Sequence, residues 1–363
     1  MKKNKNYVDL KDQPVPEGQH LLEVDDLKMY FHTEDGVVRA VDGVSYTLDR
    51  GETLGVVGES GSGKSVTAMT IMGLISMPPG KIEGGDVRYR GRSILEMTEE
   101  EMQHIRGNEI AMIFQDPMTS LNPVYKIGKQ VGEGLRLHRG YSKQEALKRA
   151  TELLDLVGIP EPEKRVNEYP HQFSCGMRQR VMIAMALACD PDILIADEPT
   201  TALDVTIQAQ IIELMQEMQE KNGNAIIMIT HDLGVVADMA DKIMVMYAGR
   251  PVEFGTAEEI FYESRHPYTW GLIRSIPEQA IEEKKPLTPI HGNPPSLMNL
   301  PEGCVFSPRC PYATDKCRKQ RPERVVTESG HYSACHYSGD PEFLKNAPET
   351  SRTRKDSKKG GEA

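Results

Sequence analysis

The sequence predicts an α/β protein with a mainly parallel sheet that is covered by helices on both faces. Apolar runs of strand length alternate with helix-length stretches, most clearly over residues 176–247. A glycine-rich loop joins one apolar run to a helical segment. Two carboxylates end another apolar run, at the edge of a parallel sheet where ligands bind. These observations predict a sheet that binds a ligand at its carboxyl edge.

The individual elements follow from the periodicity of the apolar residues. Residues 123–160 have helical spacing that is broken at Gly140 and Gly158, so they predict a helical subdomain inserted at about 123–175. The predicted strands lie at 21–31, 37–48, 53–57, 86–89, 109–114, 193–196, 225–229 and 242–247. The first two are expected to pair antiparallel, as a β subdomain before the loop. The other predicted helices lie at 66–75, 176–189 and 205–221.

Changes in composition mark the ends of this α/β unit. Residues 266–303 are expected to be a connector, because Pro and charged residues dominate its 277–301 stretch. The last residues, 351–363, contain no apolar anchor. The predicted division is a flexible lead at 1–19, an α/β domain at 20–265, the connector, a Cys-bearing segment at 304–336, and a disordered tail at 337–363.

Charge and hydropathy exclude several classes of protein. The net charge of −11 over 363 residues argues against a nucleic-acid-binding protein, which needs a basic face. No apolar run reaches the roughly 18 residues that span a bilayer. Residues 1–5 are basic but lead into charged residues, unlike a secretory signal. We expect a cytoplasmic location, with the six cysteines reduced unless a metal binds them.

Residues 58–65, Gly-Glu-Ser-Gly-Ser-Gly-Lys-Ser, have the pattern of a phosphate-binding P-loop. Its glycines allow backbone N–H groups to approach a phosphate, and Lys64 can reach the β- and γ-phosphates. The Ser65 hydroxyl can ligate Mg²⁺. A plain glycine-rich turn is disfavoured by the strand before the loop and the helix after it. The predicted nucleotide contacts are Gly58, Ser60, Gly61, Ser62, Gly63, Lys64, Ser65 and Val66.

Polar residues follow three of the predicted strands and can act on the bound nucleotide. Asp197 suits Mg²⁺, and Glu198 can polarise an attacking water as a general base. His231 can hydrogen-bond the γ-phosphate, and Gln115 can contact Mg²⁺ and the water. The alternative for the two acids is a solvated β-turn, and for His231 a structural histidine. Because all of them follow strand ends, we expect them to meet at one edge of the sheet.

Two further features bear on nucleotide binding. Phe31 or Tyr30, near the end of an early strand, can stack on an adenine ring, although either can equally be core packing. Ser174 and Gly176 open an apolar helix, whose N-terminus is an anion site. One nucleotide does not need two such helix N-termini, so this second site is expected to face the nucleotide of another subunit.

The order of these motifs resembles that of ABC-transporter ATPase subunits, over residues 20–260. The resemblance implies a P-loop ABC ATPase fold that uses ATP and Mg²⁺. It identifies Gly58 to Ser65 as Walker A, Asp197 as the Walker B acid and Glu198 as the catalytic glutamate. The implied remaining roles are Gln115 in the Q-loop, Asp204 in the D-loop, His231 as the switch histidine, Phe31 as the A-loop aromatic, and Ser174 and Gly176 in the signature that caps the opposite subunit's γ-phosphate.

Longer stretches are similar to the oligopeptide/dipeptide importer branch of that family. They are 114–123, 177–187 and 265–269. This similarity implies an ATP hydrolase that powers peptide import from the cytoplasmic face of the membrane. The implied partners are a second, different ATPase subunit, two transmembrane permease subunits and an extracytoplasmic peptide-binding protein. The alternatives are nickel, haem or oligosaccharide as cargo, a soluble non-transport ABC ATPase, and a nucleotide sensor that does not hydrolyse.

The signature departs from the family pattern at Cys175, where glycine is usual. The change can be neutral, since Ser174 and Gly176 remain. Alternatively, a Cβ and thiol crowd a loop that needs glycine dihedrals or close phosphate approach. In that case the partner's ATP site is impaired, and a heterodimer with unequal sites is expected.

Four cysteines gather near the end of the chain, at positions 304, 310, 317 and 335. Four thiols in a reducing compartment favour a metal or cluster over disulfides. The C-x5-C-x6-C-x17-C spacing lacks the C-x2-C pairs common in zinc sites. Four thiolates suit a 4Fe–4S cluster, which similar C-terminal segments in dipeptide-importer ATPases are thought to carry. Zinc, or no metal at all, stays open for Cys304, Cys310, Cys317 and Cys335.

Overall fold

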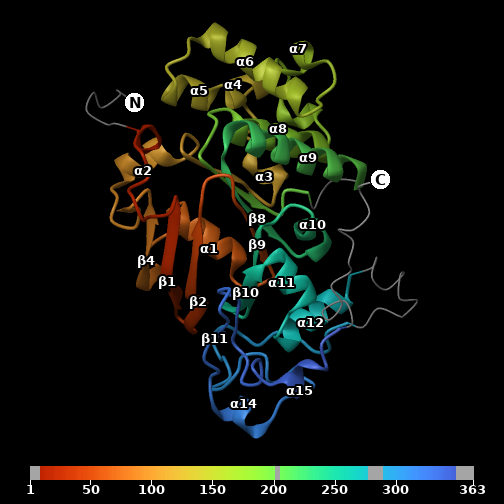
Figure 1. Ribbon diagram of the computed structural model, residues 1–363. Helices are drawn as coiled ribbons and strands as arrows, with labels where there is room; N and C mark the ends of the chain where they lie inside the picture. Colours follow the sequence, from red (N-terminus) through yellow and green to blue (C-terminus); the bar gives the residue numbers. More distant parts are fainter. Residues whose placement is uncertain (1–8, 201–204, 277–288, 349–363) are drawn as a thin grey trace.

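The computed structural model describes residues 9–200, 205–276 and 289–348, and its main feature is an eight-stranded sheet (Figure 1). Five neighbouring strands pair in parallel, and three strands at one edge pair antiparallel. In spatial order the strands are β11 (Val325–Val326), β12 (Tyr332–Ser333), β10 (Arg250–Thr256), β9 (Lys242–Tyr247), β3 (Thr53–Val57), β8 (Ala225–Thr230), β7 (Ile193–Asp197) and β6 (Ile110–Ile113). This confirms the predicted mainly parallel sheet.

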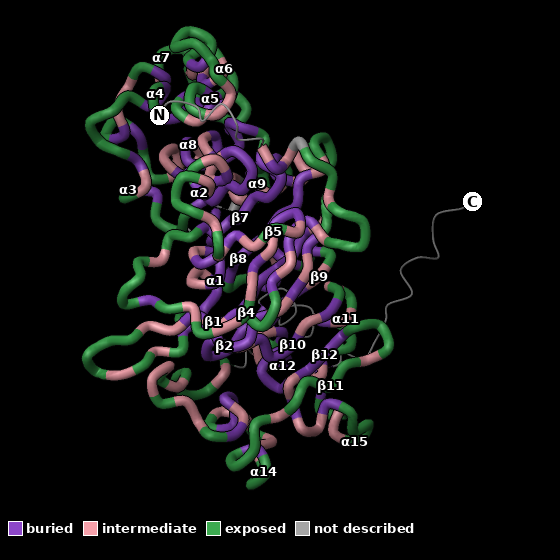
Figure 2. Tube along the Cα trace, turned by 90° about the vertical axis from the view of Figure 1, so that its left-hand side faces the viewer, coloured by how far each residue is buried: buried purple, intermediate pink, exposed green. Residues whose placement is uncertain are grey.

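The central strands are buried on both faces, as their continuous apolar runs predict. Successive residues of a strand enter two different cores, because side chains alternate across a sheet. In β7, Ile193 and Ile195 pack with the core beneath the antiparallel sheet, whereas Leu194 and Ala196 pack with the core that includes the helical insertion. Figure 2 shows these buried strands running through the middle of the molecule.

A second, four-stranded antiparallel sheet covers one face, and it matches the predicted β subdomain. Its strand order is β2 (Gly36–Leu48), β1 (Leu22–Thr33), β4 (Gly80–Tyr89) and β5 (Arg92–Ser93). β4 is longer than the strand expected at 86–89. Gly84 and Gly85 weaken its strand signal, yet it pairs with β1 from Gly80 to Tyr89.

The helical insertion lies at the end of the molecule away from the Cys-bearing segment (Figure 1). Its longest helix, α6, starts at a capping box in which Ser142 and Glu145 bond each other's backbone N–H. The glycine breaks at 140 and 158 flank this helix and have positive φ. The region comprises α3 (Pro117–Ser120), α4 (Ile127–Val131), α5 (Glu133–His138), α6 (Lys143–Leu156), α7 (Pro162–Arg165) and the 3₁₀ turn η2 (Pro170–Gln172), and leads into α8 (Cys175–Leu187).

The remaining helices lie along the sheet and in the C-terminal part. They are η1 (Leu10–Asp12), α1 (Lys64–Ile71), α2 (Glu99–Ile105), α9 (Val205–Asn222), α10 (Leu233–Ala237), α11 (Ala257–Tyr262), α12 (Pro267–Arg274), α14 (Asp315–Lys319) and α15 (Pro341–Leu344). Sequence reasoning missed β10 and α10 to α12. No helix among the described residues is both long and apolar enough to cross a membrane.

Three segments expected to be lead, connector and tail contain packed structure. Leu10, in the expected lead, is buried, and its N–H donates to the buried Glu109. The expected connector contains α12, whose Trp270 is fully buried. Phe343, in the expected disordered tail, packs on Trp270 with ring centroids 5.3 Å apart. A few apolar anchors in polar stretches therefore order more of the chain than composition indicates. Residues 277–288 and 349–363 lie outside the described residues.

Candidate nucleotide site and cysteine cavity

The predicted P-loop connects the end of β3 to the start of α1, as expected. Two of its glycines have positive φ and touch backbone. A Cβ at Gly58 would lie 2.1 Å from the carbonyl oxygen of Met246, and one at Gly63 would lie 2.3 Å from that of Ala40. A Cβ at Gly61 would meet nothing within 4 Å. Gly58 and Gly63 therefore fix the loop against the protein, while Gly61 borders open space.

Lys64 is buried under the loop, and its ammonium contacts loop carbonyls. Its Nζ donates to the carbonyl oxygens of Gly58, at 2.7 Å, and Glu59, at 3.0 Å. Burial lowers the pKa of Lys64, while the nearby carboxylates of Glu198 and Asp197 oppose that shift. The P-loop therefore holds a positive charge that can pair with a phosphate.

The side chains of Ser65 and Asp197 meet across the site. The Ser65 hydroxyl donates to Asp197 Oδ1 at 3.1 Å. Burial raises the pKa of Asp197, which is nearly inaccessible to solvent at the end of β7. A hydroxyl and a carboxylate are oxygen ligands of the kind that Mg²⁺ takes together with nucleotide phosphates and water. Because phosphates supply the other ligands, such a site needs no cluster of three protein ligands.

Glu198 lies between the two other predicted polar residues. Its carboxylate accepts a hydrogen bond from Gln115 Nε2 at 2.9 Å, and its other oxygen lies 3.3 Å from His231 Nδ1. Glu198 has a φ of +47°, an uncommon conformation for a residue with a side chain. Its N–H donates to the carbonyl of Ile229 at 2.9 Å, which fixes this conformation. Three strand ends thus bring Gln115, Glu198 and His231 together.

The predicted adenine contact has two candidates in β1. Tyr30 donates its hydroxyl to Asp42 Oδ1 at 3.0 Å, so its polar end is engaged. Phe31 has no polar group and is half-buried, opposite Val38 and Gly80 of the neighbouring strands. The stacking role of Phe31 stays a prediction.

The signature residues open α8, where Ser174 caps the helix. Its hydroxyl accepts a hydrogen bond from the N–H of Met177 at 3.3 Å, and Ser174 and Cys175 are exposed. Cys175 is the first residue of the helix, so its backbone is right-handed and needs no glycine dihedral. The expected backbone crowding is therefore absent, and only the steric effect on an incoming phosphate remains. Asp204 lies outside the described residues.

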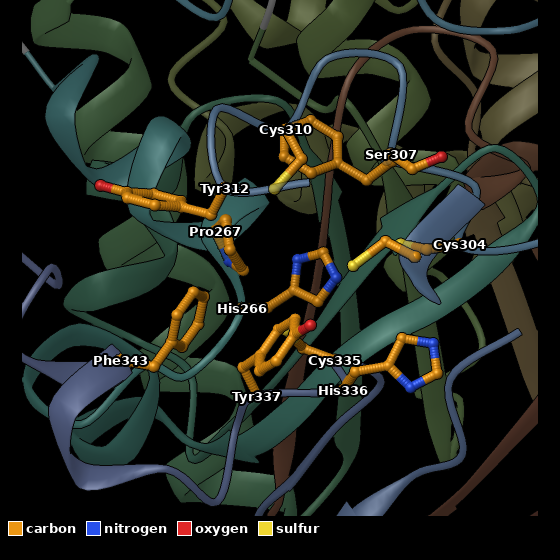
Figure 3. A pocket seen from close by; sticks show the side chains of 12 residues that line it. His266, Pro267, Cys304, Ser307, Cys310, Tyr312, Cys335, His336, Tyr337 and Phe343 are labelled. Atoms are coloured by element: carbon orange, nitrogen blue, oxygen red, sulfur yellow. The ribbon is translucent and has the colours of Figure 1, made fainter. Parts of the chain in front are cut away.

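The four C-terminal cysteines line one small cavity (Figure 3). All four are free thiols. Burial raises the pKa of the Cys310 thiol to about 11 and that of Cys335 to about 12. Among the described residues, no three His, Cys, Asp or Glu side chains stand in a geometry that could hold a metal ion. The fold thus brings the four predicted ligands to the lining of one cavity, as free thiols.

Three histidines near this cavity have separate roles. His266 lines it and is fully buried, which lowers its pKa to about 4. His331 is buried, and its Nε2 lies 3.1 Å from Glu253 Oε1. His336 Nε2 donates to the carbonyl of Gln320 at 2.9 Å. Only His266 and His336 line the cavity.

Sequence reasoning missed the residues that hold the P-loop from outside. The N–H of Glu59 donates to the hydroxyl of Tyr268 at 2.9 Å, and the Glu59 carboxylate pairs with Arg309. These residues lie about 200 and 250 positions away in sequence. Arg309 lies in no short motif, and Tyr268, although it lies in the 265–269 stretch, carries no local signal that it contacts the P-loop.

Comparisons with known proteins bear on this site. The ABC transporter family model matches residues 41–201, and the model of the oligopeptide/dipeptide transporter C-terminal region matches 252–317. The oligopeptide transport ATP-binding protein OppD of Bacillus subtilis (strain 168) is 58% identical over 86% of this chain and 87% of its own length. The dipeptide transport ATP-binding protein DppD of Escherichia coli (strain K12) is 52% identical over 88% of this chain and 97% of its own.

Solved structures with the same fold include a dimeric ATP-binding cassette in a post-hydrolysis state with bound ADP and Pi. That chain is 28% identical, with a TM-score of 0.60, and the match covers 65% of this chain and 98% of the other.

Proposed function

Because this chain belongs to the ABC transporter family and carries the oligopeptide/dipeptide C-terminal region, we infer that it is the ATP-hydrolysing subunit that powers peptide import. The observation that carries the catalytic part is the convergence of Gln115, Glu198 and His231 beside the P-loop. The peptide cargo is supported by relatives that are named for oligopeptide and dipeptide transport. Those names give nickel, haem or oligosaccharide cargo no support.

We propose the following roles at the nucleotide. The P-loop amides and Lys64 bind the β- and γ-phosphates, and Phe31 stacks on the base. Ser65, Asp197 and Gln115 hold the magnesium ion, which neutralises charge that develops on the phosphates. Glu198 polarises the attacking water, and His231 contacts the γ-phosphate. The hydrogen bond from Gln115 and the contact with His231 hold the Glu198 carboxylate in place.

We propose that two ATPase subunits close head-to-tail on two nucleotides. Ser174 and Gly176 of this chain would then cap the γ-phosphate held by the partner, with Asp204 at the interface. The exposed N-terminus of α8 supports this, because it leaves an anion-binding helix end open to another subunit. The oligopeptide and dipeptide branches favour a second, different ATPase, two permease subunits and a peptide-binding protein as partners, and a peripheral place on the cytoplasmic face. The proposed ATPase domain spans 20–265, with the Cys-bearing segment at 304–336.

We also propose that the cysteine cavity holds a 4Fe–4S cluster, with zinc as the alternative. The donor set supports the cluster, since Cys304, Cys310, Cys317 and Cys335 line one buried cavity as free thiols. Bound metal would deprotonate these thiols, whereas burial raises the pKa values of Cys304, Cys310 and Cys335. Anaerobic purification, a visible spectrum and iron analysis test this. A colourless protein without iron contradicts the cluster, and stoichiometric zinc supports the alternative.

The transport assignment is tested by the partners that the chain binds. Affinity purification of the tagged chain from detergent-solubilised native membranes, followed by mass spectrometry, should recover two multi-span proteins and a second ATPase. Recovery in the soluble fraction with ribosomal or DNA-repair proteins would contradict transport and leave the ATPase chemistry intact.

A further inference from the structure

The side chain of Arg309 connects the Cys-bearing segment to the P-loop. Arg309 directly precedes Cys310, and its side chain is 4% exposed. Its guanidinium forms a bidentate ion pair with Glu59, the second residue of the P-loop. The Nη1–Oε2 distance is 2.5 Å and the Nη2–Oε1 distance is 2.9 Å. Bidentate pairs of this kind fix geometry as well as charge.

The guanidinium has further partners, so it is rigidly held. It donates to the main-chain carbonyls of His291, at 2.9 Å, and Ile290, at 3.1 Å. It also donates to the hydroxyl of Tyr247 at 3.3 Å. Arg309 is therefore a fixed support for Glu59 rather than a mobile surface charge.

The backbone of Glu59 is held from the same side of the loop. Its N–H donates to the Tyr268 hydroxyl, which comes from α12. Tyr268 is fully buried and packs against Tyr247 and Phe306, with ring centroids 4.6 Å and 5.3 Å away. Both the peptide and the side chain of Glu59 are thus fixed by elements that follow the ATPase core in sequence.

Glu59 lies where its charge affects nucleotide binding. Its carbonyl accepts a hydrogen bond from Lys64 Nζ, so a shift of this peptide moves the lysine that faces the phosphates. Its carboxylate, if unpaired, would place negative charge in a loop that binds a polyanion. The ion pair with Arg309 neutralises that charge and holds the Glu59 side chain in place.

We propose that Arg309 is a positioning residue for ATP binding, which sets the geometry and charge of the P-loop through Glu59. This rests on the nucleotide function proposed for the loop. Arg309 itself contacts no phosphate in this arrangement, because its donors are used by Glu59, Tyr247 and main-chain carbonyls. The C-terminal segment thereby becomes part of the nucleotide site.

The test measures binding of the fluorescent analogue mant-ATP with Mg²⁺ to the full-length chain, and ATP turnover by the assembled transporter. Arg309→Gln should weaken binding about tenfold, because it leaves the Glu59 carboxylate unpaired beside the phosphates. Glu59→Gln should stay within about threefold of the wild type. The double variant should bind more tightly than Arg309→Gln alone, because it no longer has the unpaired Glu59 carboxylate. In turnover, Arg309→Gln should raise KM and leave kcat within about twofold.

A matched control separates this effect from a general loss of charge. Arg318→Gln removes an exposed ion pair with Asp315 in the same segment, and should change neither binding nor turnover. A purely structural role for Arg309 would lower kcat through an inactive fraction at unchanged KM. If Arg309→Gln fails to fold, Arg309→Lys, which keeps the charge and loses the bidentate geometry, should weaken binding about threefold.

Two results overturn the proposal. One is mant-ATP affinity that stays at the wild-type level in Arg309→Gln or, where that variant does not fold, in Arg309→Lys. The other is a double variant whose loss equals the sum of the two single losses, since uncoupled residues add. A wild-type chain that binds no mant-ATP would instead refute the nucleotide function itself, and that result is seen before any variant is compared.

Discussion

Glu198 shows how single residues reveal the site. Its positive φ costs an estimated 1–3 kcal/mol, and such strain persists only where surrounding structure maintains it. Here that structure includes the hydrogen bond from its N–H to Ile229 and the one it receives from Gln115. The strained backbone aims the carboxylate between Gln115 and His231. The sequence placed these residues at strand ends, but only the structure shows that they touch.

Replacing Glu198 by Gln removes the proposed general base and keeps the shape of the side chain. We expect ATP turnover to fall by about 10²–10⁴-fold, while mant-ATP still binds. Glu217→Gln, at an exposed position of α9, is the matched control and should leave turnover unchanged. Turnover that survives in Glu198→Gln would remove this residue from the chemistry.

The buried carboxyl group of Glu109 should make the stability of the protein depend on pH. Burial raises its pKa to about 7, although the N–H groups of Leu10 and Lys11 donate to it. For an acid with a raised folded pKa, the folded state binds the proton more tightly than the unfolded state. The contribution of Glu109 to the free energy of unfolding is therefore largest below its unfolded pKa and falls, by roughly 3 kcal/mol, as pH rises from about 4.5 to 7.

Glu109→Gln cannot titrate, so it should lack this component. The decline in melting temperature between pH 5 and pH 7.5 should be smaller in the variant than in the wild type. The change in melting temperature between the two pH values is measured within each protein. The stability lost with the hydrogen bonds of Glu109 therefore does not enter the comparison. If the melting temperatures of the wild type and the variant change equally with pH, the raised pKa of Glu109 is contradicted.

At the scale of elements, the sequence predicted the strands of the central sheet well and the C-terminal elements poorly. β3, β7, β8 and β9 are continuous apolar runs, which have few other interpretations. α12 is eight residues long, and its signal is a few aromatic residues in a polar region. Its stability comes from tertiary contacts, which local periodicity does not record.

Trp270 tests whether α12 belongs to the core. Its indole packs against Tyr312 and Phe343, and its N–H donates to the carbonyl of Ser264 at 2.9 Å. Trp270→Ala should lower the free energy of unfolding by about 3–5 kcal/mol. Tyr262→Ala, at an exposed position of the neighbouring α11, should cost far less. Equal losses in chemical denaturation would show that α12 is peripheral.

At the scale of the whole molecule, each of the two nucleotide sites in the proposed dimer would be built from residues of both subunits. In that proposed dimer, the P-loop would bind this chain's own nucleotide, and the α8 N-terminus would contact the partner's nucleotide. The P-loop and the signature residues are short, local motifs, so the sequence alone predicts both. The link from the Cys-bearing segment to the P-loop joins residues 250 positions apart, and only the fold brings them together.

Cys175 provides a test of the proposed dimer. Its Cβ and thiol are exposed at the helix end that is proposed to face the partner's phosphate. Cys175→Gly should therefore speed ATP turnover of the assembled transporter, and leave nucleotide binding to this chain unchanged. An unchanged turnover rate would contradict unequal ATP sites. Cys175→Ser, which keeps the bulk, is the control.

The most direct test of the account measures ATP hydrolysis by the reconstituted transporter as its binding protein is titrated with peptide. The account predicts hydrolysis that rises with the peptide-loaded binding protein, drives peptide into the compartment that holds the ATPases, and disappears in Glu198→Gln. Hydrolysis that is indifferent to peptide, with no peptide uptake, would contradict the account at its centre.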